Sequence, residues 1–506
     1  MTHGTWEPAP AARWEDAFLS GNGRHGAMVH GDPDDDRVIV THQALVRPLH
    51  PAFQTRVRRR RSGPSAHPVH RSVDFTTGLV AGVCGDRRSE VFVSRADDVL
   101  VQYVSAPGPV VEIDLDHRLP GVPAELGAGR GVATGRDGTL LTLRARYPGS
   151  RLGYTGHTLV LTDTGRTTVT SGGVRIEGAG HLLLLTRVRR YEGEPDPEGE
   201  GAALRALVRS VAGTGTGGTG GTGGTGRADP ADPAGVHARL LARHTALHGP
   251  AYGRVSLDLG ADPAERALPG SALLRRPGSP ALLERLFAAG RYHLLSSSSP
   301  ASPSAGLWAG EWGTARPGGL TTDVGALIAE LAQVAELCGD FSAAAAHRDL
   351  ELAGVEGDSA VSHLHHGLIA ARLGDGKSAE EALARVLAGG FFHDSLMSAR
   401  SSGRSGRHSV VAHVLPALLI ESLVQSAPGR LVLLPAPPAR CPRGRLVGVR
   451  TRFGARLDLT WTPGAYHALL RPERDARIEL RTPSGVRRIA LRAGEEFSVG
   501  SSGSVG

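Results

Sequence analysis

The feature that most constrains the fold is a hydrophobic period that changes twice along the 506-residue chain. From about residue 37 to 190, short alternating or β-branched runs are separated by Gly, Pro and Asp, a pattern typical of a β-sandwich. Between about 276 and 430, apolar residues recur every three or four positions, which indicates amphipathic helices. Beyond residue 430 the short β-branched runs return. This order predicts two β-rich parts with a helical domain between them.

These patterns predict five segments. We expect an N-terminal β-sandwich at 1–212, a disordered Gly/Thr-rich insertion at 213–235, a linker at 236–275, a helical domain at 276–430 and a C-terminal β domain at 431–506. The predicted helices cover residues 236–248, 281–295, 326–337, 360–373, 378–387 and 410–425.

Composition narrows the class of protein. Hydrophobic residues make up 40% of the chain, and no apolar run approaches the roughly 20 residues needed to span a bilayer, so no membrane association is expected. Residues 1–10 have neither a basic nor an apolar signal region, which favours a cytoplasmic protein. The three cysteines, Cys84, Cys338 and Cys441, lack the spacing of a disulfide framework or a metal site and are expected to be buried or half-buried thiols.

A net charge of +7 and a pI near 9.8 raise the question of a nucleic-acid partner. Lys377 is the only lysine and Asn22 the only asparagine, so the bias toward arginine follows from GC-rich coding. One basic run, at 56–61, precedes a Ser-Gly-Pro-Ser stretch and has no interleaved aromatic residues. We therefore interpret it as a solvated loop and expect no nucleic-acid partner.

Three segments carry a resemblance to a known family. Residues 14–31 read WEDAFLSGNGRHGAMVHG, residues 290–298 read GRYHLLSSS, and ESLVQS at 421–426 is followed by LLPAPP at 433–438. In this order they resemble glycoside hydrolase family 95, the α-L-fucosidase family. The resemblance implies an N-terminal β-supersandwich, an (α/α)6 toroid-like helical domain and a small C-terminal β-sandwich. It also implies inverting hydrolysis of terminal α-L-fucosyl residues of an oligosaccharide or fucosylated glycan, without a metal or cofactor.

Inversion requires a general acid and a base whose carboxyl groups lie roughly 6.5–9.5 Å apart. The family's Asn-x-Asn pair falls on Asp323 and Gly325, and since Asn22 is the only asparagine the pair is absent. No aspartate occurs between Ser395 and Leu457, where the family has another active-site Asp, and the general-acid segment has no match. We therefore expect activity to be reduced or lost.

The helical domain also departs from the family. A full toroid has about twelve helices, whereas about six can be identified between 276 and 430, so we expect an incomplete barrel. Because an incomplete barrel would expose its inner apolar faces, we expect either a partner subunit of a homo-oligomer or a rearrangement of the helices to cover them.

Four residues are candidates for the sugar site. Glu311 is the candidate acid, because flanking Trp308 and Trp312 could stack on a sugar and desolvate the carboxyl group. Asp323 is the candidate base, since a carboxylate can activate water unaided. The structural alternatives are a glutamate in a packing loop and an N-cap for the following helix.

Other candidates favour structural interpretations. His363, His365 and His366 could suggest a metal site, but without an acidic partner at ligand spacing they indicate a solvated or half-buried helix face. Asn22 lies in a Gly-Asn-Gly turn, where we expect it to tolerate a positive φ. Two further hypotheses for the whole chain stay open: a non-catalytic carbohydrate-binding or scaffolding pseudoenzyme, and a decayed coding sequence that folds poorly.

Overall fold

The structure is a computed structural model that describes residues 3–45, 50–60, 67–196, 198–212, 232–299, 360–399 and 409–501. Two compact units make up the chain. The β-sandwich unit comprises Trp6–Gly249 and Leu295–Gly319, and the mixed unit comprises Met1–Thr5, Pro250–Leu294 and Leu320–Gly506.

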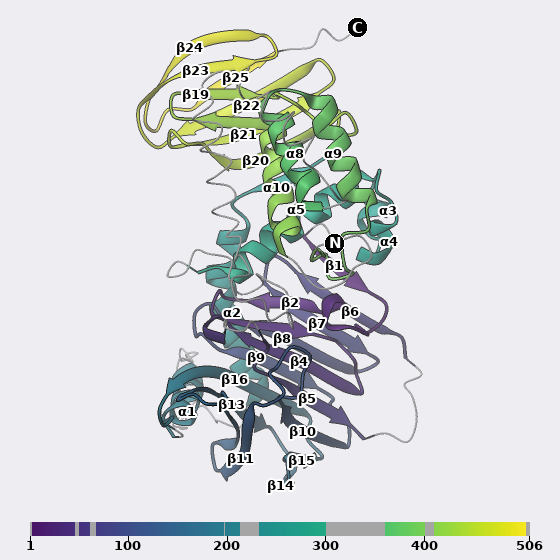
Figure 1. Cartoon of the computed structure of the whole chain (residues 1–506), viewed down its shortest axis with the longest axis vertical. Helices are drawn as coiled ribbons and strands as arrows, with labels where there is room; N and C mark the ends of the chain where they lie inside the picture. The colour runs from purple at the N-terminus through teal and green to yellow at the C-terminus, as the bar shows by residue number, and fades with distance from the viewer. Residues whose placement is uncertain are drawn as a thin grey trace, which may run out of the picture. The chain divides into compact units, whose positions relative to one another are not determined.

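The β-sandwich unit contains two large sheets (Figure 1). The nine-stranded sheet has the order β1-β6-β7-β8-β9-β16-β13-β12-β11, and the seven-stranded sheet has the order β14-β15-β10-β5-β4-β3-β2. In the first sheet the strands are β1 (Gly4–Glu7), β6 (Val69–Asp74), β7 (Leu79–Cys84), β8 (Arg87–Val93), β9 (Leu100–Ser105), β16 (His181–Glu192), β13 (Leu152–Thr162), β12 (Gly138–Arg146) and β11 (Gly127–Gly135). In the second they are β14 (Arg166–Val169), β15 (Gly173–Glu177), β10 (Val110–Asp116), β5 (Phe53–Arg59), β4 (Asp35–His42), β3 (His25–Val29) and β2 (Phe18–Gly21).

The alternation in the sequence explains why these segments form half-buried strands. Along β10, Val111, Ile113 and Leu115 are buried, whereas the intervening Glu112 and Asp114 are half-buried. Because successive side chains of a strand point to opposite faces, this pattern directs one face of the strand into the core. The predicted N-terminal β-sandwich is confirmed.

Two helices cover the nine-stranded sheet. Leu183 and Leu185 of β16 join one apolar cluster with Leu204 and Val208 of α1 (Gly199–Ala212) and Leu240 of α2 (Pro233–Tyr252). The predicted helix at 236–248 is therefore confirmed as the centre of α2. The α1 helix was not predicted from the sequence pattern.

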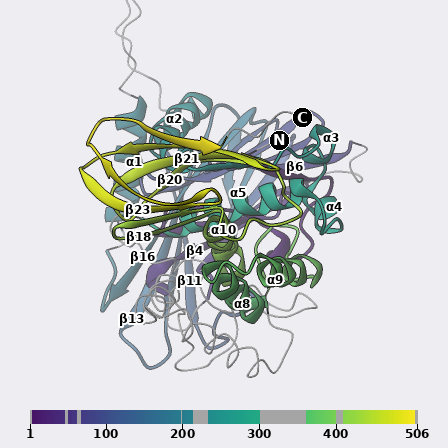
Figure 2. The same cartoon turned by 90° about the horizontal axis from the view of Figure 1, so that it is seen from above.

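The remaining described α-helices lie in the mixed unit, apart from the last three residues of α5. They are α3 (Pro263–Arg266), α4 (Gly270–Leu274), α5 (Pro280–Ser297), α8 (Ala360–Arg372), α9 (Gly376–Ala388) and α10 (Ser409–Leu423). Figure 2 shows α8 and α9 side by side, and α10 packs on α8. Gly367 allows the close approach of α8 and α10, since a Cβ there would lie 3.0 Å from Leu418 Cδ2. The helices predicted at 281–295, 360–373, 378–387 and 410–425 are confirmed to within a few residues.

Two smaller sheets complete this unit. One has the order β17-β20-β21-β22-β25 and the other β18-β19-β23-β24, in which β19 and β23 run parallel. Their strands are β17 (Ser256–Asp258), β18 (Val424–Ala427), β19 (Arg430–Leu433), β20 (Gly444–Arg450), β21 (Ala455–Thr462), β22 (Ala465–Pro472), β23 (Ala476–Thr482), β24 (Gly485–Leu491) and β25 (Phe497–Ser501). The predicted order of a β-sandwich, helices and C-terminal β structure is confirmed.

The interpretation of the basic run as a solvated loop is wrong for residues 56–59. These residues belong to β5, whose neighbours β4 and β10 supply acidic side chains. Three arginines of the run form ion pairs with carboxylates across the sheet, namely Arg56 with Asp35, Arg58 with Asp114 and Arg60 with Glu112. The charge of the run is therefore largely compensated within the β-sandwich unit.

Among the described helices, none combines the length and the apolar character that a bilayer span requires.

Candidate functional site

The four residues predicted for sugar binding and catalysis, Trp308, Glu311, Trp312 and Asp323, lie outside the described residues. The predicted helix at 326–337, Cys338 and residues 213–231 of the predicted Gly/Thr-rich insertion lie outside them as well. Predicted disorder is wrong for residues 233–235, because they form the start of α2. The site that the structure does describe is built around the first of the three segments that resemble family 95.

Asn22 organises the turn between β2 and β3. Its Oδ1 accepts hydrogen bonds from the backbone N–H groups of Arg24 and His25, each at 2.9 Å. Its Nδ2 donates to the carbonyl oxygen of Ser94 and to Oδ1 of Asp98, also at 2.9 Å. Asn22 is only 6% exposed, so every polar atom of its amide is used inside the fold.

The predicted positive φ at Asn22 is wrong, because the left-handed residue of this turn is Gly23, with φ of 87°. The N–H of Gly23 donates to the carbonyl oxygen of Ser296 at 2.9 Å. A Cβ at Gly23 would lie 2.4 Å from the carbonyl carbon of Ser298, so both the backbone angle and the close approach require glycine. The two segments that resemble family 95, at 14–31 and 290–298, therefore meet at this turn.

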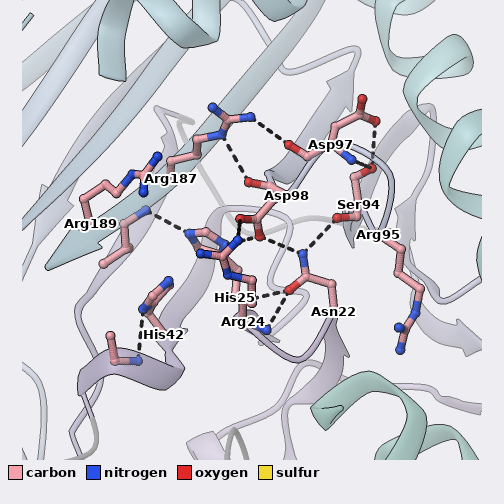
Figure 3. A network of polar contacts seen from close by, with 12 residues as sticks. Asn22, Arg24, His25, His42, Ser94, Arg95, Asp97, Asp98, Arg187 and Arg189 are labelled. Carbon is pink, nitrogen blue, oxygen red and sulfur yellow. Dashed lines mark hydrogen bonds and ion pairs between the residues drawn. The ribbon is translucent and has the colours of Figure 1, made fainter. Parts of the chain in front are cut away.

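His25 and Asp98 form a pair beside the turn, in which His25 is buried and the side chain of Asp98 is 35% exposed (Figure 3). Nδ1 of His25 lies 2.9 Å from Oδ1 of Asp98, and Nε2 of His25 accepts the backbone N–H of Val188 at 3.0 Å. The second contact places the imidazole hydrogen on Nδ1. Both ring nitrogens are thus engaged, which leaves His25 without the free nitrogen that a general base needs.

Strand pairing explains why Val188 is bound by a side chain. The pairing of β16 with β9 extends only to Thr186 opposite Leu100. Asp98, with φ of 51°, lies in the turn between β8 and β9, before β9 begins at Leu100. The imidazole of His25 thereby takes the place of a strand neighbour for the N–H of Val188.

Charges and burial set the protonation of the site. Burial raises the pKa of Asp98, but hydrogen bonds from His25 and Asn22 and the positive charge of Arg24 outweigh it and hold that pKa well below its usual range. Burial, reinforced by repulsion from nearby cations, lowers the pKa of His42 to about 3. Its Nδ1 accepts the N–H of Ala44 at 3.1 Å, so the neutral ring carries its hydrogen on Nε2.

A cavity of about 320 Å³ opens beside this network. Nine residues line it: Arg24, His25, His42, Ala44, Asp98, Arg187, Val188, Arg189 and Arg190. All of them belong to the β-sandwich unit, and we call the space the arginine cavity. Its volume lies in the range of small-molecule sites, roughly 300–1,000 Å³.

No sequence pattern predicted the residues that line the arginine cavity. Arg24 and His25 lie inside the first family-like segment, which offered a signal, but their partners lie far along the chain. Residues 187–190 follow an apolar run, and this pattern predicts only the end of a strand, not a binding site.

The histidines predicted on a solvated or half-buried helix face lie on α8, and that prediction is wrong for His363, which is buried. On α8, His363 is buried and His365 and His366 are half-buried. Within the described ranges, no group of three His, Cys, Asp or Glu side chains could hold a metal ion. Cys84 and Cys441 are buried free thiols, as expected.

Comparisons with known proteins identify the fold. No protein-family model matches the chain, and no curated protein matches it by sequence. A solved structure described as "Putative kojibiose phosphorylase from human microbiome" superimposes with a TM-score of 0.56 at 7% sequence identity, covering 99% of each chain. The chain therefore shares a fold with this protein over its whole length.

Proposed function

We propose that this chain is a carbohydrate-active protein of the glycoside hydrolase type that acts on terminal α-L-fucosyl residues of oligosaccharides. The hydrogen bond between Gly23 and Ser296 carries the proposal, because it joins two family-like segments that are far apart in sequence. The two halves of the third segment are also bonded, from the N–H of Leu434 to the carbonyl oxygen of Leu423 at 2.7 Å. The shared fold with a protein described as a kojibiose phosphorylase supports the carbohydrate-active class.

In this proposal Asp323 activates the attacking water and Glu311 protonates the leaving oxygen. Trp308 and Trp312 stack on the faces of the sugar. Because a lone carboxylate replaces the family's Asn pair, we expect turnover below that of the family's enzymes.

The test is release of free L-fucose from a panel of terminal α-L-fucosides by the purified full chain. The proposal predicts release that falls at least a hundredfold in Asp323→Asn. The matched control is Asp137→Asn, which changes the same charge at a carboxylate that is 43% exposed and paired with Arg209. Equal activity in the wild type and Asp323→Asn would overturn the role of Asp323.

The second candidate is a sugar-binding protein without turnover, which the absent Asn pair favours. It predicts no fucose release, together with saturable binding of a fucosylated oligosaccharide that is lost in Trp308→Ala. A folded wild-type protein that neither releases fucose nor binds the oligosaccharide would overturn both candidates.

A further inference from the structure

The arginine cavity carries an excess of positive charge. Four arginines are among the residues that line it: Arg24, Arg187, Arg189 and Arg190. Two carboxylates are bound to them. Asp98 pairs with Arg24 at 3.1 Å, and Glu200 of α1 is shared between Arg189 and Arg187. Two positive charges are left over, and within the described residues Arg190 makes no ion pair.

Arg187 is held in place without losing its charge. Its Nη2 donates to the carbonyl oxygen of Asp97 at 2.7 Å, and its Nε donates to that of Asp98 at 3.1 Å. Carbonyl oxygens orient a guanidinium group but carry no net charge to neutralise it. Its nearest carboxylate oxygen on Glu200 is 4.0 Å away. The side chain is therefore fixed in orientation and available to an anion.

His42 adds a neutral donor to the wall. Its ring is uncharged at neutral pH and carries a hydrogen on Nε2, as its contact with Ala44 requires. A neutral imidazole can donate to an anionic oxygen without adding further charge. The lining of the cavity thus combines charged guanidinium groups with one neutral hydrogen-bond donor, and such a combination of donors suits an oxyanion.

We propose that the arginine cavity binds a phosphate group, either as inorganic phosphate or as the phosphate ester of a sugar. The two unpaired positive charges match the charge of a phosphate dianion. Planar guanidinium groups match its oxygens as pairs of donors. The described residues that line this cavity include none of the four proposed for the sugar site above.

The experiment is calorimetric titration of the full chain at low ionic strength with inorganic phosphate, glucose 6-phosphate and glucose. We expect phosphate-bearing ligands to bind and glucose not to bind. Tighter binding of glucose 6-phosphate than of inorganic phosphate would identify a sugar ester as the ligand, and equal affinity would identify the free anion. Both results support the site. If neither inorganic phosphate nor glucose 6-phosphate binds, the proposal is overturned.

Three substitutions locate the binding. Arg190→Gln removes an unpaired charge and should weaken binding roughly ten- to hundredfold, the range for a lost charge-assisted hydrogen bond. Glu200→Gln frees Arg187 and Arg189 and should tighten binding several-fold, an effect that a purely structural role would not produce. Arg166→Gln is the matched control, since Arg166 is exposed on β14 and does not line the cavity.

Equal weakening by Arg190→Gln and Arg166→Gln would mean that only net charge matters and would overturn the site. Unchanged affinity in both Arg190→Gln and Glu200→Gln would overturn it as well. Since binding is measured without turnover, these outcomes are distinct from the failure of fucose release.

Discussion

Two histidines stacked along α2 should make the β-sandwich unit sensitive to acid. His244 and His248 are each 1% exposed, and their ring centroids lie 5.1 Å apart. Nδ1 of His244 accepts the N–H of Arg95 at 3.1 Å, and Nε2 of His248 lies 2.9 Å from the carbonyl oxygen of Phe75. Each ring thus bonds to backbone from a different part of the β-sandwich unit.

Burial is the main cause that lowers the pKa of His244 to about 3 and that of His248 to about 4. An unfolded histidine takes up its proton near pH 6.5. Between these values the unfolded state binds more protons than the folded state, so stability falls as the pH falls from about 6.5 toward 4. Going from pH 7.5 to 5.5, the linkage relation gives a loss of about 1.4 kcal/mol for each histidine, or roughly 3 kcal/mol together.

The assay is urea unfolding of the full chain at pH 7.5 and 5.5, compared between the wild type and a double variant. His244→Asn keeps an acceptor for the N–H of Arg95, and His248→Gln keeps a donor for the carbonyl oxygen of Phe75. We expect the acid-induced loss to be smaller in the double variant by roughly 3 kcal/mol. His70→Gln, at an exposed histidine on β6, should leave the loss unchanged. Equal losses in the wild type and the double variant would refute the reasoning.

Two further predictions concern stability. Gly156→Ala should destabilise the chain by about 1–3 kcal/mol, because its Cβ would lie 2.1 Å from Cε1 of the fully buried Phe53. A urea series checks this against Gly129→Ala, where the new Cβ has no atom within 4 Å, and equal midpoints would contradict the packing argument. Asp98→Asn should cost about 1 kcal/mol at pH 7, since the charged partner of Arg24 and His25 is lost while asparagine still tolerates the positive φ. Because the pKa of Asp98 lies well below its usual range, this difference should persist down to about pH 4 and close only in stronger acid, which unfolding curves from pH 7 to 3 would reveal.

Local periodicity was enough to place most helices and many strands. The α8 and α9 helices begin and end within a few residues of the predicted limits, because their apolar stripes and the N-cap at Asp375 are encoded locally. The α10 helix ends earlier than predicted, at Leu423, because Val424 begins β18 and pairs with Leu433. That competition between helix and sheet depends on a segment further along the chain, which periodicity does not register.

The arginine cavity was beyond sequence analysis for a related reason. Asp98, which lines the cavity, accepts a hydrogen bond from Asn22, a residue 76 positions earlier in the chain. The Gly-Asn-Gly sequence around Asn22 predicts a turn. That Asn22 bonds to Asp98 could not be predicted, because the position of Asp98 depends on where β9 begins in the folded sheet. Sequence patterns identified the Gly-Asn-Gly motif. Its structural role could not be predicted, because that role depends on residues that only folding brings next to it.

The pairing of β17 with β20 determines how the C-terminal part can be produced and dissected. Ser256, Leu257 and Asp258 form the edge of a sheet whose other strands begin at Gly444. During synthesis, β17 cannot pair until the ribosome has made β20, which begins at Gly444. A fragment cut at residue 431 would leave β17 behind and expose the backbone of β20, inviting association between copies. Expression of this region alone should therefore succeed only if residues 250–294 are supplied with it.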